Sequence, residues 1–393
     1  MGFLRTAAGI VGLILIIALA MEVTCRLDDW IRYRTPIWSR VVSEEDLLVR
    51  DADGMHARRN SRFQKWVINE VGTRGPSAAS QKSPGALRVV TVGASETFGL
   101  YESPDQEFPR QLEDSLRRWL TVPECATGGP PHRIEVLNAA IFGMSLPTVI
   151  ADVAARVRRL GPDVVVVYPT PVQYLAGLPP VAATPDSTGA DAVLAPTRAF
   201  YPRALGRLRQ QLKRMTPAWL LTYSRERAID DALADTAEGP PFADFPADRM
   251  ALYERDLGRL ISTIRAIGAE PVLVTHANWS MSGHPDSAML TAWRQNYPRA
   301  SGSLILAFDS AGADATRRVA ADSAVTLVDL AAAVRGHRGP VFADYAHFTD
   351  AGAAFVARTI GEGLLRTDRV RRWCGVPENG RLVVADDPGA ASR

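Results

Sequence analysis

Five short apolar runs separated by amphipathic segments limit this chain to few folds. Continuous apolar runs are typical of strands that are buried on both faces of a parallel sheet. Helical spacing between the runs, as in Leu112, Leu116 and Leu120, predicts helices that pack an apolar face on that sheet. The expected strands are residues 87–93, 134–139, 163–168, 270–275 and 325–330. The alternation predicts an α/β fold: a three-layer α/β/α sandwich with a doubly wound, five-stranded parallel sheet in flavodoxin-like order 2-1-3-4-5.

Chemically useful residues follow the end of each expected strand. Ser95 follows the first strand, Gly143 the second, Thr170 the third and His276 the fourth, and His347 lies in the loop after the fifth. The carboxyl ends of parallel strands meet at one edge of a doubly wound sheet, where ligands bind. We therefore expect these residues to converge on one site.

Three of the residues near this edge form a set suited to nucleophilic catalysis. A serine hydroxyl is a poor nucleophile at neutral pH, so it needs an imidazole to take its proton and a carboxylate to orient that imidazole. Ser95 supplies the hydroxyl, and Asp344 precedes His347 by three positions. Taken singly, each residue has a common structural role, such as a helix cap or a turn former. Their combination predicts a catalytic triad.

The chain resembles the SGNH (GDSL-type) hydrolase superfamily in the order and spacing of short motifs. Gly93-Ala94-Ser95 matches the first family block, and Asp344-Tyr345-Ala346-His347 matches the last. The segment around Gly143 is similar to the second block, whose glycine donates a backbone hydrogen bond. The resemblance covers residues 67–174 and 270–366. It implies that Ser95 is the nucleophile, that His347 and Asp344 complete the triad, and that the N–H groups of Ser95 and Gly143 form the oxyanion hole, without a cofactor.

The third family block is not matched. Pro171 stands where the family has an asparagine that donates to the oxyanion. Another group would have to replace it, or the hole has one donor fewer. The candidates for substrate or oxyanion contacts are Thr170, Gln173, His276 and Asn278. We expect no metal site, because no cluster of Cys, His and carboxylates accompanies the histidines.

The N-terminus carries a candidate membrane helix. Residues 6–25 lie between Arg5 and Arg26 and are apolar or small apart from three polar residues. This length spans a hydrocarbon core. Glu22 lies near one end, where it can pair with Arg26 at i,i+4. The motif Asn69-x-x-Gly72-x-Arg74-Gly75 further resembles the lead-in of membrane-anchored members of the superfamily.

A cleaved signal peptide is the alternative to an anchor, because Ala18-Leu19-Ala20 offers a small-x-small site after the apolar run. Four arginines between residues 26 and 40 outnumber Arg5 on the other side, so the positive-inside rule places the domain in the cytoplasm. We nevertheless expect an external domain. A short basic start before an apolar run is what export machinery reads, and long domains translocate largely regardless of charge.

The remaining chain divides as follows. Residues 26–66 are expected to form a juxtamembrane linker, 67–370 the hydrolase domain and 371–393 a C-terminal tail. Within the domain, residues 175–247 break the alternation, with basic and apolar helical segments near 203–214 and 220–234. A long insertion after the third strand lies at the active-site edge, so it is either a cap over the site or a surface excursion.

Together these features predict a serine esterase anchored in a bacterial inner membrane, with its domain in the periplasm or exterior. Its expected substrate is an ester, such as an O-acetylated envelope carbohydrate. An O-acyltransferase with the same triad and a non-catalytic carbohydrate-binding or assembly protein are the alternatives. A net charge of +2, with basic residues spread along the chain, argues against a nucleic-acid partner.

A disulfide between Cys125 and Cys374 is a further expectation from topology. In sheet order 2-1-3-4-5 the first and last helices lie side by side on one face, and both run antiparallel to the strands. The two cysteines follow the C-terminal ends of these helices. They could therefore approach within the roughly 6 Å Cα separation of a disulfide, and an external compartment would preserve the bond.

Overall fold

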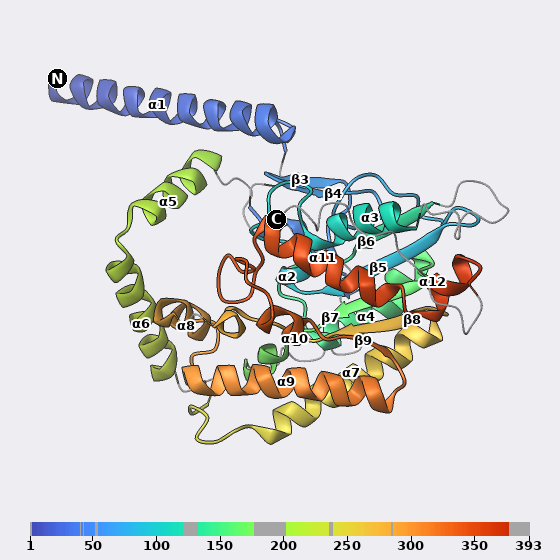
Figure 1. Cartoon of the computed structure of the whole chain (residues 1–393). Coiled ribbons are helices and arrows are strands. Elements are labelled where there is room, and N and C mark those ends of the chain that lie inside the picture. The colour runs from blue at the N-terminus through green and yellow to red at the C-terminus, as the bar shows by residue number, and fades with distance from the viewer. Residues whose placement is uncertain are drawn as a thin grey trace, which may run out of the picture.

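The computed structural model describes residues 2–39, 41, 43–51, 54–120, 133–176, 202–235, 239–283 and 286–376. At its centre is a five-stranded parallel sheet in the order β6-β5-β7-β8-β9, which confirms the predicted fold (Figure 1). The strands are β5 (Leu87–Gly93), β6 (Ile134–Asn138), β7 (Val164–Tyr168), β8 (Glu270–Val274) and β9 (Thr326–Val328). All residues of β5, β6 and β7 are buried, as their continuous apolar runs indicate.

Helices cover both faces of the sheet. Side chains of β5 alternate between two cores, with Val89 on one face and Val90 on the other. One face packs against α3 (Phe108–Trp119) and α11 (Asp350–Leu364). The other packs against α4 (Leu146–Ala155), α7 (Ala247–Ala266) and α9 (Gly302–Asp322). The shorter helices are α2 (Ser95–Phe98), α8 (Ser287–Arg294), α10 (Leu330–Arg335) and α12 (Asp368–Trp373).

The first and last helices of the domain pack directly on one another, as the sheet order requires. Contact between α3 and α11 is close because Gly361 has no side chain. A Cβ there would lie 2.4 Å from the Trp119 ring. The expected disulfide was inferred from this packing of α3 on α11. Cys374 is buried and disulfide-bonded, Cys25 is free, and Cys125 lies outside the described residues.

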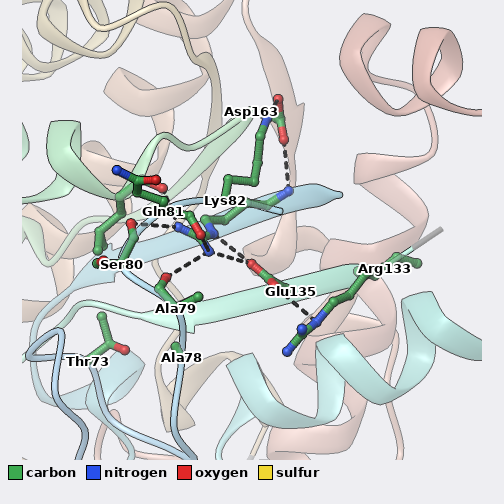
Figure 2. A network of polar contacts seen from close by, with 12 residues as sticks. Thr73, Ala78, Ala79, Ser80, Gln81, Lys82, Arg133, Glu135 and Asp163 are labelled. Carbon is green, nitrogen blue, oxygen red and sulfur yellow. Dashed lines mark hydrogen bonds and ion pairs between the residues drawn. The ribbon is translucent and has the colours of Figure 1, made fainter. Parts of the chain in front are cut away.

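A buried arginine at the amino-terminal edge of the sheet fixes the segment that enters β5. The Arg88 side chain is fully buried, and its Nε donates to Glu135 Oε2 at 2.8 Å. Its guanidinium also donates to backbone carbonyls of residues 79–81 and of Leu160. Figure 2 shows Glu135, Lys82 and Asp163 in this network; Lys82 Nζ lies 2.6 Å from Asp163 Oδ1. A buried charge is tolerated when its donors are satisfied in this way.

The expected linker at residues 26–66 is instead largely structured. The first helix, α1 (Gly2–Tyr33), continues to residue 33. After a 3-10 turn at Glu45–Leu47, two short antiparallel hairpins follow: β1 (Leu48–Asp51) with β2 (Gly54–Ala57), and β3 (Ser61–Phe63) with β4 (Trp66–Ile68). Leu47, Met55 and Trp66 are buried in the domain core. Strands of three or four residues are too short to show a periodicity, which is why the sequence pattern missed them.

Two helices lie where an insertion was expected, α5 (Arg203–Met215) and α6 (Ala218–Ala234). They run along the side of the domain from which α1 projects, with α6 packed near α8 (Figure 1). At the other end of the chain, the expected tail begins later than residue 371. Helix α12 packs Val370 in the core, and residues 377–393 lie outside the described part of the chain.

Candidate active site

The structure brings Ser95, His347 and Asp344 together in one hydrogen-bonded chain. His347 Nε2 lies 2.8 Å from Ser95 Oγ, and its Nδ1 lies 2.9 Å from both carboxylate oxygens of Asp344. Ser95 begins α2 directly after β5, and the other two residues lie in the loop between α10 and α11. The expected convergence of these side chains is confirmed. Hydroxyl, imidazole and carboxylate have the contacts that a triad requires.

Backbone hydrogen bonds explain why the last motif places its two side chains together. Asp344 Oδ1 accepts the N–H groups of Ala346 and His347, each at 2.9 Å. This turn holds the carboxylate beside the imidazole three residues later. The His347 carbonyl also accepts the Ala343 N–H at 2.7 Å. The loop therefore presents the pair as a fixed unit.

Electrostatics support the roles that each group would have. Burial acts to raise the pKa of Asp344, but hydrogen bonds from His347 and the backbone outweigh it and hold that pKa below its ordinary value. Burial acts to lower the pKa of His347, whereas the Asp344 hydrogen bond and the charge of Glu96 raise it above the usual range. Asp344 is thus an ionised partner, and His347 is a stronger base than a free imidazole.

The glycine of the first motif is required by packing. A Cβ on Gly93 would lie 2.3 Å from Thr97 Oγ1 and 2.7 Å from the Tyr168 carbonyl oxygen. No larger residue fits at the end of β5, where the chain turns sharply into α2. The Gly-x-Ser spacing therefore follows from the turn that exposes Ser95 at the sheet edge.

A small cleft beside this turn contains residues from the ends of three strands. Ala94 follows β5, Met144 follows β6, and Thr170 and Gln173 follow β7. Gly143, next to Met144, is exposed and has a left-handed φ of +79°. A larger cleft at the opposite edge of the sheet is lined by Arg265 and other charged residues and contains none of the predicted site residues. The small cavity next to Ala94 lies at the edge of the sheet that carries Ser95, and no triad residue lines it.

A buried charged cluster lies behind Ser95, and the sequence did not predict it. Glu96 Oε2 is 3.3 Å from Ser95 Oγ, and Glu96 Oε1 is 3.5 Å from His276 Nε2. On its other side His276 Nδ1 lies 2.7 Å from Asp309 Oδ1, on α9. Thr170 Oγ1 donates to Glu96 Oε1 at 3.2 Å. The two His276 contacts lack hydrogen-bond alignment, so charge attraction holds the imidazole between the carboxylates.

The imidazole of His276 and the carboxylates beside it stabilise one another in their charged forms. Burial acts to lower the pKa of His276, but Asp309 and Glu96 raise it to about 10. Burial acts to raise the pKa of Glu96, but His276 and His347 lower it to about 2. At neutral pH, His276 is therefore an imidazolium between two carboxylates.

The cluster corrects two expectations about substrate contacts. His276 has no exposed surface, and Asn278 is only 2% exposed. Asn278 Nδ2 donates to Asp309 Oδ2 at 2.7 Å, away from the cleft. Strand-end convergence placed both residues near the site, but it cannot show which way a side chain points. Nothing in the sequence distinguished Glu96 from an ordinary acidic residue at a helix start.

Aromatic side chains border the triad. The rings of Tyr101 and Tyr345 lie 5.4 and 5.9 Å from the His347 ring, and Tyr345 stacks on Trp293. Tyr101 is 56% exposed. Burial and the charge of Asp344 raise the pKa of Tyr101 to about 12, while the charge of Arg225 acts against them. Arg225 lies on α6, so the inserted helices reach the surroundings of the site.

Comparison with known proteins gives only distant likenesses. No family model matches the chain, and no curated protein matches it. Among solved structures, a lipase/acylhydrolase from Enterococcus faecalis is 14% identical, with a TM-score of 0.39 over 71% of this chain and 95% of that one. The acetyl xylan esterase AlAXEase is 15% identical, with a TM-score of 0.40 over 71% and 100%. A putative SGNH hydrolase from Slackia heliotrinireducens is 15% identical, with a TM-score of 0.38 over 71% and 99%.

Likenesses at these scores carry no argument about this chain.

Proposed function

We propose that this protein is a membrane-anchored serine esterase of the SGNH type. One observation carries the proposal: the Ser95–His347–Asp344 hydrogen-bond chain at the carboxyl edge of a doubly wound sheet. The match of the first and last motifs to the superfamily supports the same assignment.

The proposed mechanism has two halves. Ser95 Oγ attacks the ester carbonyl while His347 Nε2 takes the hydroxyl proton, and His347 then returns this proton to the leaving alkoxide. Water next attacks the acyl-Ser95 ester, with His347 as base, and releases the acid. Asp344 fixes the tautomer of His347 and stabilises its charged form. The N–H groups of Ser95 and Gly143 are the proposed donors to the oxyanion.

Gln173 is the proposed replacement for the asparagine of the missing third block. Its side chain is partly exposed and lines the cleft with Ala94. Thr170 is less suitable, because its hydroxyl donates to Glu96. Removing one oxyanion donor costs about 100- to 1,000-fold in kcat. Gln173→Ala should therefore lower kcat by up to that factor, whereas Thr170→Val should lower it less.

The proposed substrate is an acylated carbohydrate, with α5 and α6 as a cap beside the cleft. A sugar ring packs well on an exposed aromatic side chain, and Tyr101 presents one next to His347. The effect of the Arg225 charge on Tyr101 supports placing α6 near the entrance. Activity on O-acetylated polysaccharide that falls in Tyr101→Ala through KM more than kcat would support this substrate class.

The N-terminal helix is the proposed anchor. Thr6–Tyr33 is a 28-residue stretch with a hydropathy of 2.4 in its most apolar part, and 6% of that part is buried. Such a helix near an N-terminus also fits a signal sequence. We propose an uncleaved anchor with an external domain. The turns of α1 that bind α5 begin at Glu22, so they would remain after cleavage before Met21, and only the N-terminus of the mature protein separates the two cases. Retention in membranes after carbonate washing, with an intact N-terminus, tests the anchor; a soluble protein starting at Met21 would contradict it.

A fluorophosphonate probe tests the nucleophile. The wild type should be labelled and Ser95→Ala should not, whereas Ser262→Ala, on the exposed side of α7, should behave as the wild type. Hydrolysis of p-nitrophenyl acetate should follow the same pattern. Labelling that persists in a folded Ser95→Ala variant would refute the assignment.

An O-acyltransferase would form the same acyl-Ser95 and pass the group to a sugar hydroxyl. Product analysis with an acceptor sugar separates the two reactions. The complete triad argues against the non-catalytic alternative.

A further inference from the structure

Helix α5 carries an apolar face that no described part of the protein covers. Leu205, Leu208, Leu212 and Met215 follow one another at spacings of three and four residues, so they lie on one side of the helix. Their exposed fractions range from 47% to 79%. A row of four large apolar side chains in water is unfavourable, and such a row marks a contact with an apolar phase or a partner.

The apolar row continues onto α6. Trp219 is 71% exposed and Tyr223, one turn later, is 55% exposed, with Leu220 beside them at 39%. Tryptophan and tyrosine are enriched at the water interface of membranes, because their rings are apolar and their polar atoms stay hydrated. We call the seven side chains of this row the α5–α6 face: Leu205, Leu208, Leu212, Met215, Trp219, Leu220 and Tyr223.

The polar side of α5 is bound to the end of α1. Arg203 Nη1 lies 3.0 Å from Asp29 Oδ2, and Arg207 pairs with both Asp28 and Asp29. The Ala204 N–H donates to Glu22 Oε2 at 3.0 Å. These bonds fix α5 at the point where the apolar part of α1 ends, and they leave the α5–α6 face turned away from α1.

Helices α5 and α6 lie on the side of the domain from which α1 projects (Figure 1). In α1, Ile14, Leu15 and Ile16 are 58% to 67% exposed, as expected for a helix that lies in lipid. If α1 crosses the membrane, as proposed above, its ion-paired C-terminal turns lie at the membrane surface. Helix α5, bound to those turns, lies at the same level.

We infer that the α5–α6 face lies in the interfacial layer of the bilayer that α1 crosses, so that the insertion docks the catalytic domain on the membrane surface. A helix with one apolar side, a basic polar side and a low overall apolar content is typical of helices that lie in this layer. The inference rests on the proposed anchor.

Charge favours lipid over a second copy of the chain as the occupant. Arg209 is exposed next to the apolar row. Basic residues beside an apolar face attract anionic headgroups. The same residues on two facing copies would repel each other.

Depth-dependent fluorescence in proteoliposomes tests the inference on the full chain. Leu212→Cys places a single NBD label on the α5–α6 face, in a Cys25→Ser background. The matched control is Gln210→Cys on the polar side of α5, which lines a cleft with Asp28 and Arg32. With phosphatidylglycerol-rich vesicles that contain shallow spin-labelled lipid, the Leu212 label should shift to the blue and be quenched, because its helix face is buried in the interfacial layer. The Gln210 label should change little.

Four outcomes separate the possibilities. Equal, unquenched emission at both positions would overturn the inference. A blue shift that depends on protein concentration but not on quencher lipid would indicate a second copy and would also overturn it. A label at Ile16→Cys in α1, measured with lipid that carries its spin label deep in the acyl chain, reports on the anchor: if Ile16 is quenched there and Leu212 is not quenched by the shallow lipid, the anchor stands and the surface docking fails. If neither label is quenched and the protein does not float with the vesicles, the proposed anchor itself fails.

Discussion

The Ser95 hydroxyl lies between two acceptors, and the balance between them sets the chemistry of the site. His347 Nε2 is at 2.8 Å and Glu96 Oε2 is at 3.3 Å. A hydroxyl has one proton, so the nearer imidazole is the better acceptor. The more distant carboxylate acts mainly through its charge, which favours the protonated form of His347. The imidazolium of His276 offsets part of this charge, so the site is not strongly anionic where an oxyanion must form.

The charge of Glu96 should appear in the pH profile of kcat/KM. His347 accepts a proton only when neutral, so activity is lost as pH falls through its pKa, which Glu96 helps to raise. In Glu96→Gln that pKa falls, and the acid limb should move to lower pH. Glu96→Asp keeps the charge and should leave the limb closer to its original position. An unmoved limb in a folded Glu96→Gln variant would show that Glu96 does not act on the base.

Asp344 should matter far more for turnover than for stability. The carboxylate fixes the tautomer of His347, and an amide would favour the wrong one. By analogy with other triads, Asp344→Asn should lower kcat by about 10,000-fold. Its thermal midpoint should change by a few degrees at most, because Asp344 is partly exposed in a surface loop. Turnover equal to that of the wild type would show that another group orients His347.

At the scale of elements, the buried cluster joins three parts of the fold. Glu96 lies on α2, His276 follows β8, and Asp309 lies on α9. The cluster therefore connects the turn that carries Ser95 to α9, one of the helices on the face of the sheet that α4 and α7 also cover. Its members are almost completely buried, so each charge depends on the others for stabilisation.

Removing the central cation should destabilise the protein strongly. His276→Asn leaves two buried carboxylates without a counter-charge, at a cost of about 3–5 kcal/mol. The pKa of His276 is raised to about 10, so its contribution is full below its ordinary value of 6.5 and is lost as pH rises through about 10. Glu96, with its pKa near 2, contributes above 4.5 and loses that contribution as pH falls through about 2.

Urea unfolding at neutral pH measures the effect. His337→Asn is the control, because His337 is partly exposed and stacks only on Phe355. A loss in His276→Asn no greater than in this control would contradict the buried ion cluster.

The sequence predicted those elements whose pattern is long enough to show a period. All five core strands were located to within about two residues, because each is a continuous apolar run. The hairpins β1–β4 were missed because their strands are only three or four residues long. At the site, motif spacing found Ser95, Asp344 and His347. Glu96 and Asp309 could not be found, because the burial of a carboxylate is decided by helices distant in sequence.

At the scale of the whole molecule, three sets of contacts among the described residues join parts of the chain that are distant in sequence. Ion pairs join α1 to α5, the Arg88 network holds the segment before β5, and Cys374 is disulfide-bonded beside α12. The α1–α5 ion pairs lie on the side of the domain from which α1 projects, and the Arg88 network lies at the amino-terminal edge of the sheet. The site lies at the carboxyl edge, where the chain is fixed by the turns that carry the triad.

The partner of Cys374 is the last prediction. The chain has three cysteines and Cys25 is free, so Cys125 is the expected partner. Helices α3 and α11 pack on one another on the same face of the sheet, so the segments that follow these two helices begin close together. A bond that closes a loop of about 250 residues stabilises by about 5.5 kcal/mol in the chain-entropy model, with any strain subtracting from it. Cys374→Ser should lose stability of this order, whereas Cys25→Ser should lose little.

Non-reducing peptide mapping of the protein from isolated membranes decides the pairing. A peptide pair joining Cys125 to Cys374, together with an alkylatable Cys25, is the expected result. Because such bonds persist only in oxidising compartments, this result would also support the external orientation, against the count of arginines after α1. Alkylation of both Cys125 and Cys374 in unreduced protein would exclude the bond. It would then favour a cytoplasmic domain, where the positive-inside rule places it.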